Sequence, residues 1–156
     1  MDKKEGDMPI MEAEKTKEVQ AKQGERIELL KKFEDRPKYV MLEKTKALYT
    51  MMHPYLELFP KSEKFTLRSK IEEVILDSIK LLVLQNYQQT NEERRKIMLG
   101  FLANLYLLEV LLQQVAIFRY LSYEGFDRCV SLLREINNSA LSRYKNLNGG
   151  RENEKI

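Results

Sequence analysis

The chain has 156 residues, of which 43% are hydrophobic and 33% are charged, and its formal net charge is +3. That length suits one domain with a hydrophobic core and is short for two. Six glycines and four prolines are few for a protein built from short strands and turns, so the composition predicts a mostly α-helical protein.

Cysteine usage and hydropathy exclude several other classes. Cys129 is the only cysteine, which excludes an intrachain disulfide and a cysteine-based zinc site and favours a reducing compartment. The N-terminus MDKKEGDMPIMEAEKTKE lacks the apolar core of a secretory signal peptide. Residues 101–121, the most apolar window, include Asn104, Glu109 and Arg119 and are too polar for a membrane span. We therefore expect a cytoplasmic protein that does not enter a membrane.

Residues 1–35 form a charged N-terminal extension with eight Lys/Arg and ten Asp/Glu. Their apolar positions are too sparse to bury much surface. We expect this extension to be disordered or partly helical, with a short amphipathic helix in residues 23–33, where Ile27, Leu30 and Phe33 recur at helical spacing. Residues 148–156 are expected to form a disordered tail.

Residues 36–147 are expected to form four helices, and prolines mark the limits of the first. Pro37 suits a first helical position, Pro54 should kink the axis, and Phe59 precedes Pro60 and should end the helix. Ser62 is expected to cap a second helix that ends near residue 87. The apolar stripes of these two helices are Val40, Leu48, Tyr49, Met52, Leu56 and Phe59, and then Leu67, Ile71, Val74, Ile75, Ser78, Ile79 and Leu82.

Thr90 and Glu93 have capping-box spacing and predict a third helix that ends near residue 121. Gly100 within it is interpreted as allowing another helix to approach closely. The helix is apolar on more than one face, whereas a helix in a four-helix monomer needs a single stripe. The surplus predicts a surface for a partner. Its apolar residues are Met98, Phe101, Leu102, Leu105, Leu108, Leu111, Leu112, Val115, Phe118 and Leu121.

Ser122 is expected to cap the fourth helix, and Gly149 and Gly150 are expected to end it. Short loops place consecutive helices antiparallel, which predicts an all-α, up-down-up-down four-helix bundle. The apolar stripe of the fourth helix is Phe126, Val130, Leu133, Asn137, Ala140, Leu141 and Tyr144.

The sequence lacks the usual residues of an active site. His53 is the only histidine, and no Glu-x-x-His pair is present for a di-iron centre. No nucleophile elbow and no glycine-rich phosphate loop occur. We expect no cofactor, no metal and no enzymatic activity. An enzyme that uses His53 is the least favoured alternative.

Basic residues are the remaining candidates for a binding site. Residues 36–150 carry seventeen Lys/Arg against twelve Asp/Glu. In an antiparallel bundle, the clusters in residues 61–70 and 94–96 lie at opposite ends, as contacts to an extended phosphate backbone would require. The alternative is a solvated, ion-paired surface, because Glu63, Glu92 and Glu93 interrupt both clusters. The candidate nucleic-acid-binding or partner-binding residues are Lys61, Lys64, Arg68, Arg94, Arg95, Lys96, Arg119, Arg128, Arg134 and Arg143.

The stretch LFPKSEKFTLRSKIEEVILDSIKLL, preceded by LYTMMHPYLELF, resembles the second-helix entry of the Avd proteins. These are the accessory variability determinants of diversity-generating retroelements, and they belong with the four-helix proteins encoded in 23S ribosomal-RNA intervening sequences. The resemblance covers roughly residues 38–147, including FRYLSYEGFDRCVSLLREIN. Its most specific part is the Phe-Pro-(Lys/Arg)-Ser-(Glu/Gln)-(Lys/Arg)-Phe corner, which carries over only Lys61 and Lys64.

The resemblance implies a non-enzymatic bundle that assembles as a homopentameric ring. Its basic surface would bind the retroelement reverse transcriptase together with RNA or DNA, in support of mutagenic retrohoming. Two alternatives stay open: an intervening-sequence protein with a structural or RNA-associated role and no reverse transcriptase, and a purely structural helical oligomer. The N-terminal extension of about 35 residues is longer than the family core needs.

Overall fold

The computed structural model describes the backbone of residues 2–31 and 39–154 and the side chains of residues 13–28 and 39–148. These residues are all-helical and include no strand. The chain divides into two compact units, Met1–Lys38 and Tyr39–Ile156. The second unit is called the helical unit below.

The first unit consists of helix α1, Asp2–Lys31. It is longer than the short helix predicted in residues 23–33. Residues 13–28 are exposed, and Val19 and Ile27 are each 54% exposed. The described part of α1 therefore contributes no buried core of its own. Residues 32–38, including the predicted helix start at Pro37, lie outside the described residues.

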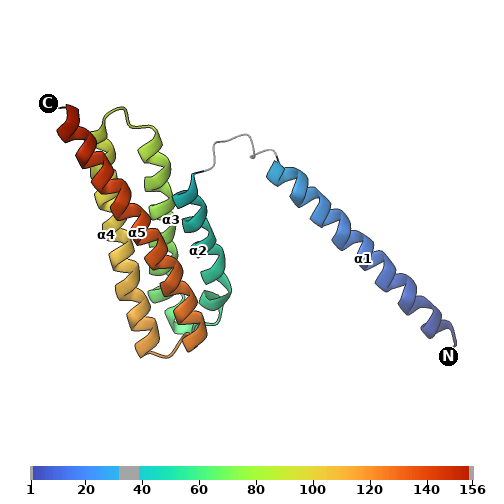
Figure 1. Ribbon diagram of the computed structural model, residues 1–156. Helices are drawn as coiled ribbons and strands as arrows, with labels where there is room; N and C mark the ends of the chain where they lie inside the picture. The colour runs from blue at the N-terminus through green and yellow to red at the C-terminus, as the bar shows by residue number, and fades with distance from the viewer. Residues whose placement is uncertain (1, 32–38, 155–156) are drawn as a thin grey trace. The chain divides into compact units, whose positions relative to one another are not determined.

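The helical unit contains α2 (Val40–Glu57), the short 3-10 helix η1 (Lys61–Glu63), α3 (Leu67–Asn86), α4 (Asn91–Ile117) and α5 (Tyr123–Glu154). Each α-helix packs against the next along the chain, and α2 also packs against α5 (Figure 1). The predicted stripes of α3 and α4 supply much of the shared core. Its fully buried large residues are Leu48, Met52, Leu56, Ile71, Ile75, Leu82, Met98, Phe101, Leu105, Leu108, Leu112 and Ile136.

Two of the three predicted helix caps are confirmed. The Thr90 hydroxyl accepts a hydrogen bond from the Glu93 N–H at 3.2 Å, and the Ser122 hydroxyl accepts one from the Gly125 N–H at 3.1 Å. The predicted cap at Ser62 is wrong, because the chain makes a 3-10 turn after Pro60 and α3 begins only at Leu67. The Leu67 N–H at the start of α3 instead donates a hydrogen bond to the carboxylate of Glu63.

The ends of the last two helices also differ from the prediction. Helix α4 ends at Ile117 rather than near residue 121, since Arg119 adopts a left-handed φ of 60° that an α-helix cannot continue. Helix α5 continues to Glu154, past the expected end at Gly149 and Gly150 and into the expected tail. Glycine permits a helix to end but does not force it.

Some predicted core residues lie at the surface, and several buried residues were not predicted. Val40, Phe118 and Leu141 are 67%, 51% and 38% exposed. Each lies at a helix end or on the edge of a stripe, where periodicity predicts burial least well. The buried residues that were not predicted include Met41, Thr45, Gln85, Ile136 and Leu147.

Replacing each of the two glycines of the helical core with alanine is expected to have opposite effects on stability. A Cβ at Gly100 would lie 3.7 Å from its nearest neighbour, Leu81 Cδ1, so this glycine is not needed for close helix approach, contrary to the interpretation of the sequence. Gly100→Ala should raise the free energy of unfolding by up to about 1 kcal/mol. A Cβ at Gly125 would lie 2.9 Å from Tyr55 Cε1 and from Leu121 Cδ1. Gly125→Ala should therefore lower the free energy of unfolding by about 1 to 2 kcal/mol, a value that already includes the gain in helix propensity.

Urea unfolding followed by circular dichroism measures both variants under the same conditions. A destabilised Gly100→Ala variant would show that this position is tighter than its neighbours indicate.

Candidate nucleic-acid interface

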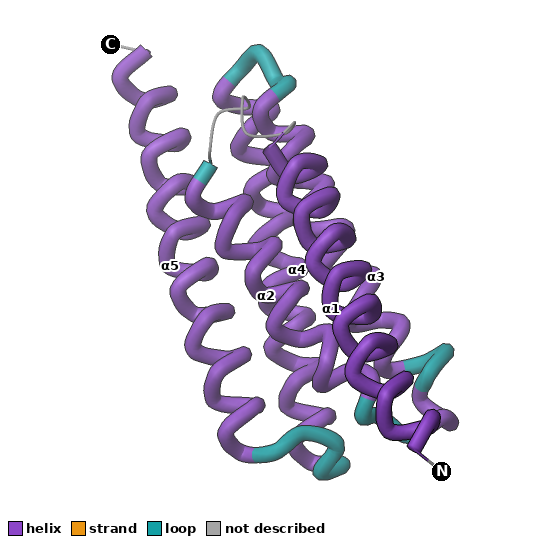
Figure 2. Tube along the Cα trace, turned by 90° about the vertical axis from the view of Figure 1, so that its right-hand side faces the viewer, coloured by secondary structure: helices purple, strands orange, loops and turns teal. Residues whose placement is uncertain are grey.

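Two connections between helices lie at the same end of the helical unit (Figure 2). They are residues 58–66, between α2 and α3, and residues 118–122, between α4 and α5, and together they are called the corner end. Tyr120 joins them: its ring centroid lies 5.5 Å from that of Phe59, and its hydroxyl donates to Glu63 Oε1 at 3.4 Å. Phe59 is buried. The LFPKSEKF segment is therefore held against the α4–α5 connection by an aromatic contact and a hydrogen bond.

The Glu63 carboxylate accepts hydrogen bonds from residues of its own corner. Its Oε2 accepts from the Thr66 hydroxyl at 2.6 Å and from the Leu67 N–H at 3.4 Å. The Thr66 hydroxyl lowers the pKa of Glu63 most, and desolvation opposes it. Burial, followed by the neighbouring Glu63 charge, raises the pKa of the Tyr120 hydroxyl. Glu63 thus accepts hydrogen bonds that cap α3 and hold the corner, whereas the sequence indicated only that it interrupts the basic cluster and suits the first turn of a helix.

The corner is expected to loosen at low pH. Because the folded-state pKa of Glu63 lies below its ordinary 4.5, its carboxylate stabilises the fold above that pH and loses this effect as the pH falls through the folded pKa. Glu63→Gln should therefore reduce the acid dependence of the unfolding midpoint, measured by thermal melts from neutral to acid pH. Glu73→Gln, an exposed control on α3, should leave the acid limb unchanged. Equal acid dependence in wild type and Glu63→Gln would contradict this role.

Four of the predicted cations lie at or next to the corner end with exposed side chains: Lys61, Lys64, Arg119 and Arg128. None of them forms an ion pair within the described part of the chain. Lys64 Nζ lies 5.5 Å from the centroid of the Phe65 ring. These positive charges are therefore available to an anionic ligand.

The cluster at the start of α4 is partly structural. Arg94 donates to the Gln88 carbonyl at 2.7 Å and to Asn91 Oδ1 at 3.1 Å, which ties down the α3–α4 connection. Arg95 donates to Asn148 Oδ1 at 2.8 Å and links α4 to α5. Lys96 is exposed. Replacing the whole cluster would consequently disturb the fold as well as the surface charge.

The other predicted cations do not belong to the corner end, because they form contacts elsewhere or lie further along α5. Arg68 pairs with Glu72 at 3.2 Å on the surface of α3. Arg134 is exposed and borders a cavity of about 30 Å³ between α4 and α5, which has room for one water molecule and not for a larger ligand.

Arg143 belongs to a polar cluster between α2, α3 and α5. Its Nε is buried and has no hydrogen-bond partner among the described residues. Burial raises the pKa of Tyr39, and the Arg143 charge opposes this. The Tyr39 hydroxyl accepts a hydrogen bond from Gln85 Nε2 at 3.2 Å. Arg143 is thus placed beside a buried network rather than within an open basic patch.

The residues considered for catalysis have ordinary surroundings. His53 is exposed, and its Nε2 lies 3.2 Å from Glu57 Oε1, one turn along α2. Within the described residues, no group of three His, Cys, Asp or Glu side chains could hold a metal ion. Burial raises the pKa of the Cys129 thiol to about 11, which makes it a poor nucleophile at neutral pH.

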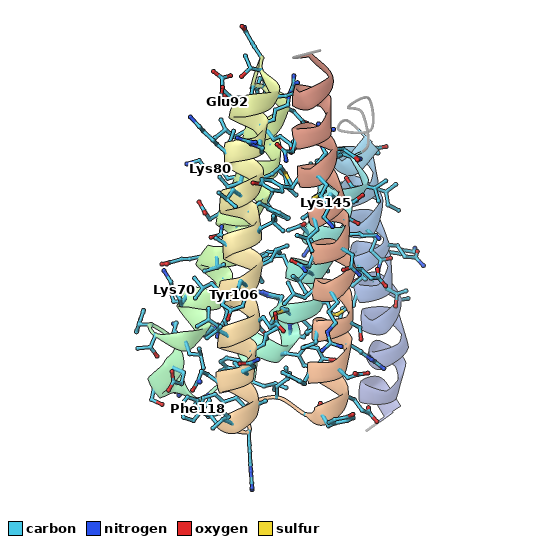
Figure 3. The ribbon with its side chains drawn as sticks, turned by 60° about the vertical axis from the view of Figure 1, so that its left-hand side comes forward. Lys70, Lys80, Glu92, Tyr106, Phe118 and Lys145 are labelled. Carbon is cyan, nitrogen blue, oxygen red and sulfur yellow. The ribbon has the colours of Figure 1, made fainter. Side chains whose placement is uncertain are left out.

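A second surface feature is an apolar face formed by α3 and α4, called the α3–α4 face below. It borders a groove of about 530 Å³ whose lining includes Leu76, Asp77, Asn104 and Leu107. Asn104 Nδ2 donates to Asp77 Oδ2 at 2.8 Å across the groove. Figure 3 shows Tyr106 on α4, with Lys70 and Lys80 on the neighbouring α3. The exposed apolar residues of the two helices include Leu76, Val83, Leu84, Tyr87, Leu99, Tyr106 and Leu107.

Helix α4 is long and apolar enough, by length and composition, to cross a membrane, and 28% of its most apolar window is buried. Composition alone therefore does not exclude a span, contrary to the sequence prediction, although the core helix of a soluble protein meets the same criterion. The helix packs against both α3 and α5. Much of its apolar surface nevertheless stays uncovered within one copy of the chain.

Three exposed aromatic side chains at or next to the corner end were not predicted from the sequence. Phe65, Tyr123 and Phe118 are 85%, 83% and 51% exposed. Phe65 and Tyr123 fall outside the predicted apolar stripes, and this position could have indicated that their side chains are exposed. Phe118 was instead predicted to lie in the core. No protein-family model matches the chain, and no curated protein is significantly similar to it. The resemblance to the Avd proteins thus depends on the quoted stretches alone.

Proposed function

We propose that this chain is a non-enzymatic accessory protein of a diversity-generating retroelement, acting in the cytoplasm. In this role it binds the reverse transcriptase and nucleic acid, either RNA or cDNA, through its basic surface. The observation that carries the proposal is the state of Lys61 and Lys64, the two cations of the Phe-Pro-Lys-Ser-Glu-Lys-Phe corner. Both are exposed without an ion pair among the described residues, while the Glu63 carboxylate between them is engaged by the corner.

The proposal includes an up-down-up-down antiparallel bundle of α2 to α5. Contacts between helix ends support this arrangement. The start of α2 meets the end of α3 through Tyr39 and Gln85, and the start of α4 meets the end of α5 through Arg95 and Asn148. Cations at the two ends of such a bundle could contact phosphates that are well separated along one strand.

The proposal also includes a ring-like homo-oligomer, with five copies as the resemblance implies. The α3–α4 face supports assembly, because Leu76, Leu99 and Tyr106 are 48%, 56% and 70% exposed there and large exposed apolar side chains are typical of interaction sites. A ring would repeat the basic ends of each copy around one axis. Several weak phosphate contacts would then add to a higher overall affinity.

Co-purification tests the partner half of this function. The proposal predicts that a reverse-transcriptase gene lies beside the gene for this chain, and the full chain expressed with that enzyme should elute together with it and with bound nucleic acid. A Lys61→Glu/Lys64→Glu variant should lose most of the nucleic acid, because charge reversal repels phosphates. Lys145→Glu, an exposed control elsewhere on α5, should behave as wild type.

The outcomes separate the candidate functions. Failure of the chain to bind a reverse transcriptase, together with retained RNA binding, would favour the intervening-sequence type of protein. Absence of both interactions would leave a purely structural helical oligomer and would contradict the proposal.

A further inference from the structure

The corner end carries exposed aromatic side chains among its cations, and the proposed function does not yet use them. Phe65 is 85% exposed and directly follows Lys64, whose ammonium lies 5.5 Å from the Phe65 ring centroid. Tyr123 is 83% exposed at the start of α5. Folding alone gains nothing from leaving two aromatic rings in water.

We infer that the corner end binds single-stranded nucleic acid, with unpaired bases stacked on Phe65 and Tyr123 and phosphates contacted by Lys61, Lys64 and Arg119. This inference rests on the nucleic-acid half of the proposed function and adds the form of the nucleic acid. Protruding aromatic rings offer stacking faces to bases of any sequence. A duplex keeps its bases stacked within the helix, so it could use only the cations.

The side chain of Arg119 is a further candidate for a phosphate contact at the corner end. Arg119 has a φ of 60°, a left-handed conformation that glycine adopts without strain and that arginine adopts at a cost. Its side chain is exposed and forms no ion pair within the described residues. The left-handed φ serves to end α4, because the Arg119 N–H donates to the Ala116 carbonyl at 3.1 Å and the Tyr120 N–H donates to the Val115 carbonyl at 3.1 Å. The exposed charge of Arg119, unpaired among the described residues, is therefore what makes it a candidate for a phosphate contact.

The corner end is also held in one shape before any ligand binds. The Tyr120 ring centroid lies 5.5 Å from that of Phe59 and 5.5 Å from that of Phe118. The hydrogen bond from Tyr120 to Glu63 adds a polar link between the connections. Figure 3 shows Phe118 at the end of α4 that lies opposite Glu92. Because the two connections are fixed to each other, binding would order fewer groups.

Charge alone would give only modest affinity at this end. Glu124 and Asp127 are also exposed near the start of α5, so the local excess of positive charge is small. Stacking must therefore contribute a large part of binding. This distinguishes the site from a purely electrostatic one, in which aromatic substitutions have no effect.

Fluorescence anisotropy with the full chain tests this inference. The probes are labelled oligo-U and oligo-dT of about twelve nucleotides and a duplex of the same length. Wild type should bind the single strands at least tenfold more tightly than the duplex. Phe65→Ala/Tyr123→Ala should weaken single-strand binding about tenfold or more without changing its salt dependence. Tyr87→Ala, a control on an aromatic residue that is 77% exposed at the end of α3, should bind as wild type.

The Arg119→Gly variant tests the phosphate contact of Arg119 separately from any effect on the stability of the fold. It should weaken single-strand binding and make the salt slope shallower by about 0.7, the value for one phosphate contact on a single strand. Its melting temperature should equal or exceed that of wild type, because glycine relieves the backbone strain. Unchanged affinity in this variant would remove Arg119 from the site.

Three results would overturn the inference, and they differ in which part of the proposed function they leave standing. If wild type binds duplex as tightly as single strands, or if Phe65→Ala/Tyr123→Ala binds as wild type, stacking is wrong while nucleic-acid binding remains. If wild type binds neither probe at low salt, both the inference and the nucleic-acid half of the proposed function fail. Thermal melts of each variant check that the fold is intact.

Discussion

Replacing Tyr106 with glutamate is expected to dissociate the proposed homo-oligomer into monomers without unfolding the helices. Tyr106 is 70% exposed on α4, and its neighbours Leu99 and Leu107 are 56% and 36% exposed. A carboxylate at this position stays solvated in a monomer but would lose its water in an apolar interface between copies. Burying an unpaired charge costs roughly several kcal/mol of free energy, and this cost is enough to dissociate most interfaces of moderate affinity.

Light scattering coupled to gel filtration measures the mass, and circular dichroism measures the helix content. Ser131→Glu, which adds the same charge at an exposed position of α5, should leave the assembly intact. A monomeric mass for wild type would contradict assembly altogether. An unchanged mass for Tyr106→Glu would place the interface on a face other than α3–α4.

Replacing Phe101 with alanine should lower the free energy of unfolding by about 3 to 5 kcal/mol, the largest stability effect expected for a single substitution in this chain. Phe101 is fully buried on α4 in a core formed mainly by leucine, isoleucine, methionine and valine side chains. Removing its ring loses the apolar transfer free energy and leaves a cavity that helix packing can close only in part. A domain of this size has little stability to spare, so the variant should be partly unfolded at physiological temperature.

The matched control is Leu99→Ala, two residues away on the same helix and 56% exposed. Its effect should be within about 0.5 kcal/mol when both variants are made in the monomeric Tyr106→Glu background, because a surface residue of a monomer loses few contacts. Urea midpoints with unchanged m-values measure the difference. Similar midpoints for Phe101→Ala and Leu99→Ala would show that the core is packed differently.

The helices of the unit Tyr39–Ile156 could largely be predicted because their signals are local. The spacing of three and four between Ile71, Val74, Ile75 and Ser78 identifies the buried side of α3, and all four are buried. The cap at Thr90 likewise depends only on its own turn. Local patterns of this kind are read directly from neighbouring residues.

Features that depend on distant contacts could not be predicted. Tyr120 acts on a corner 57 positions away in the chain, and its polar partner is Glu63. Ser62 looked like a cap because Pro60 precedes it, yet the 3-10 turn moves the start of α3 to Leu67. Neither the register of that turn nor the packing of Tyr120 has a signature in the spacing of apolar residues.

The candidate site shows the same division. Exposure of Lys61 and Lys64 followed from their place in a charged loop, and the structure has both exposed. The internal bond of Arg95 could not be foreseen, since its acceptor Asn148 lies 53 residues further along the chain. Charge clusters in a sequence therefore mix ligand-binding cations with structural ones, and only the packed helices separate the two.

Affinity for single-stranded RNA across a salt series, measured with the wild-type chain, is the most direct test that the basic surface binds nucleic acid. Between about 50 and 200 mM salt, the logarithm of the association constant should fall linearly with the logarithm of salt concentration, with a slope of about −2 to −3 for three or four phosphate contacts at one corner end. A ring of several copies on a longer strand should steepen this slope. Absence of binding at the lowest salt, or an affinity that does not change with salt, would contradict phosphate contact through Lys61, Lys64 and Arg119.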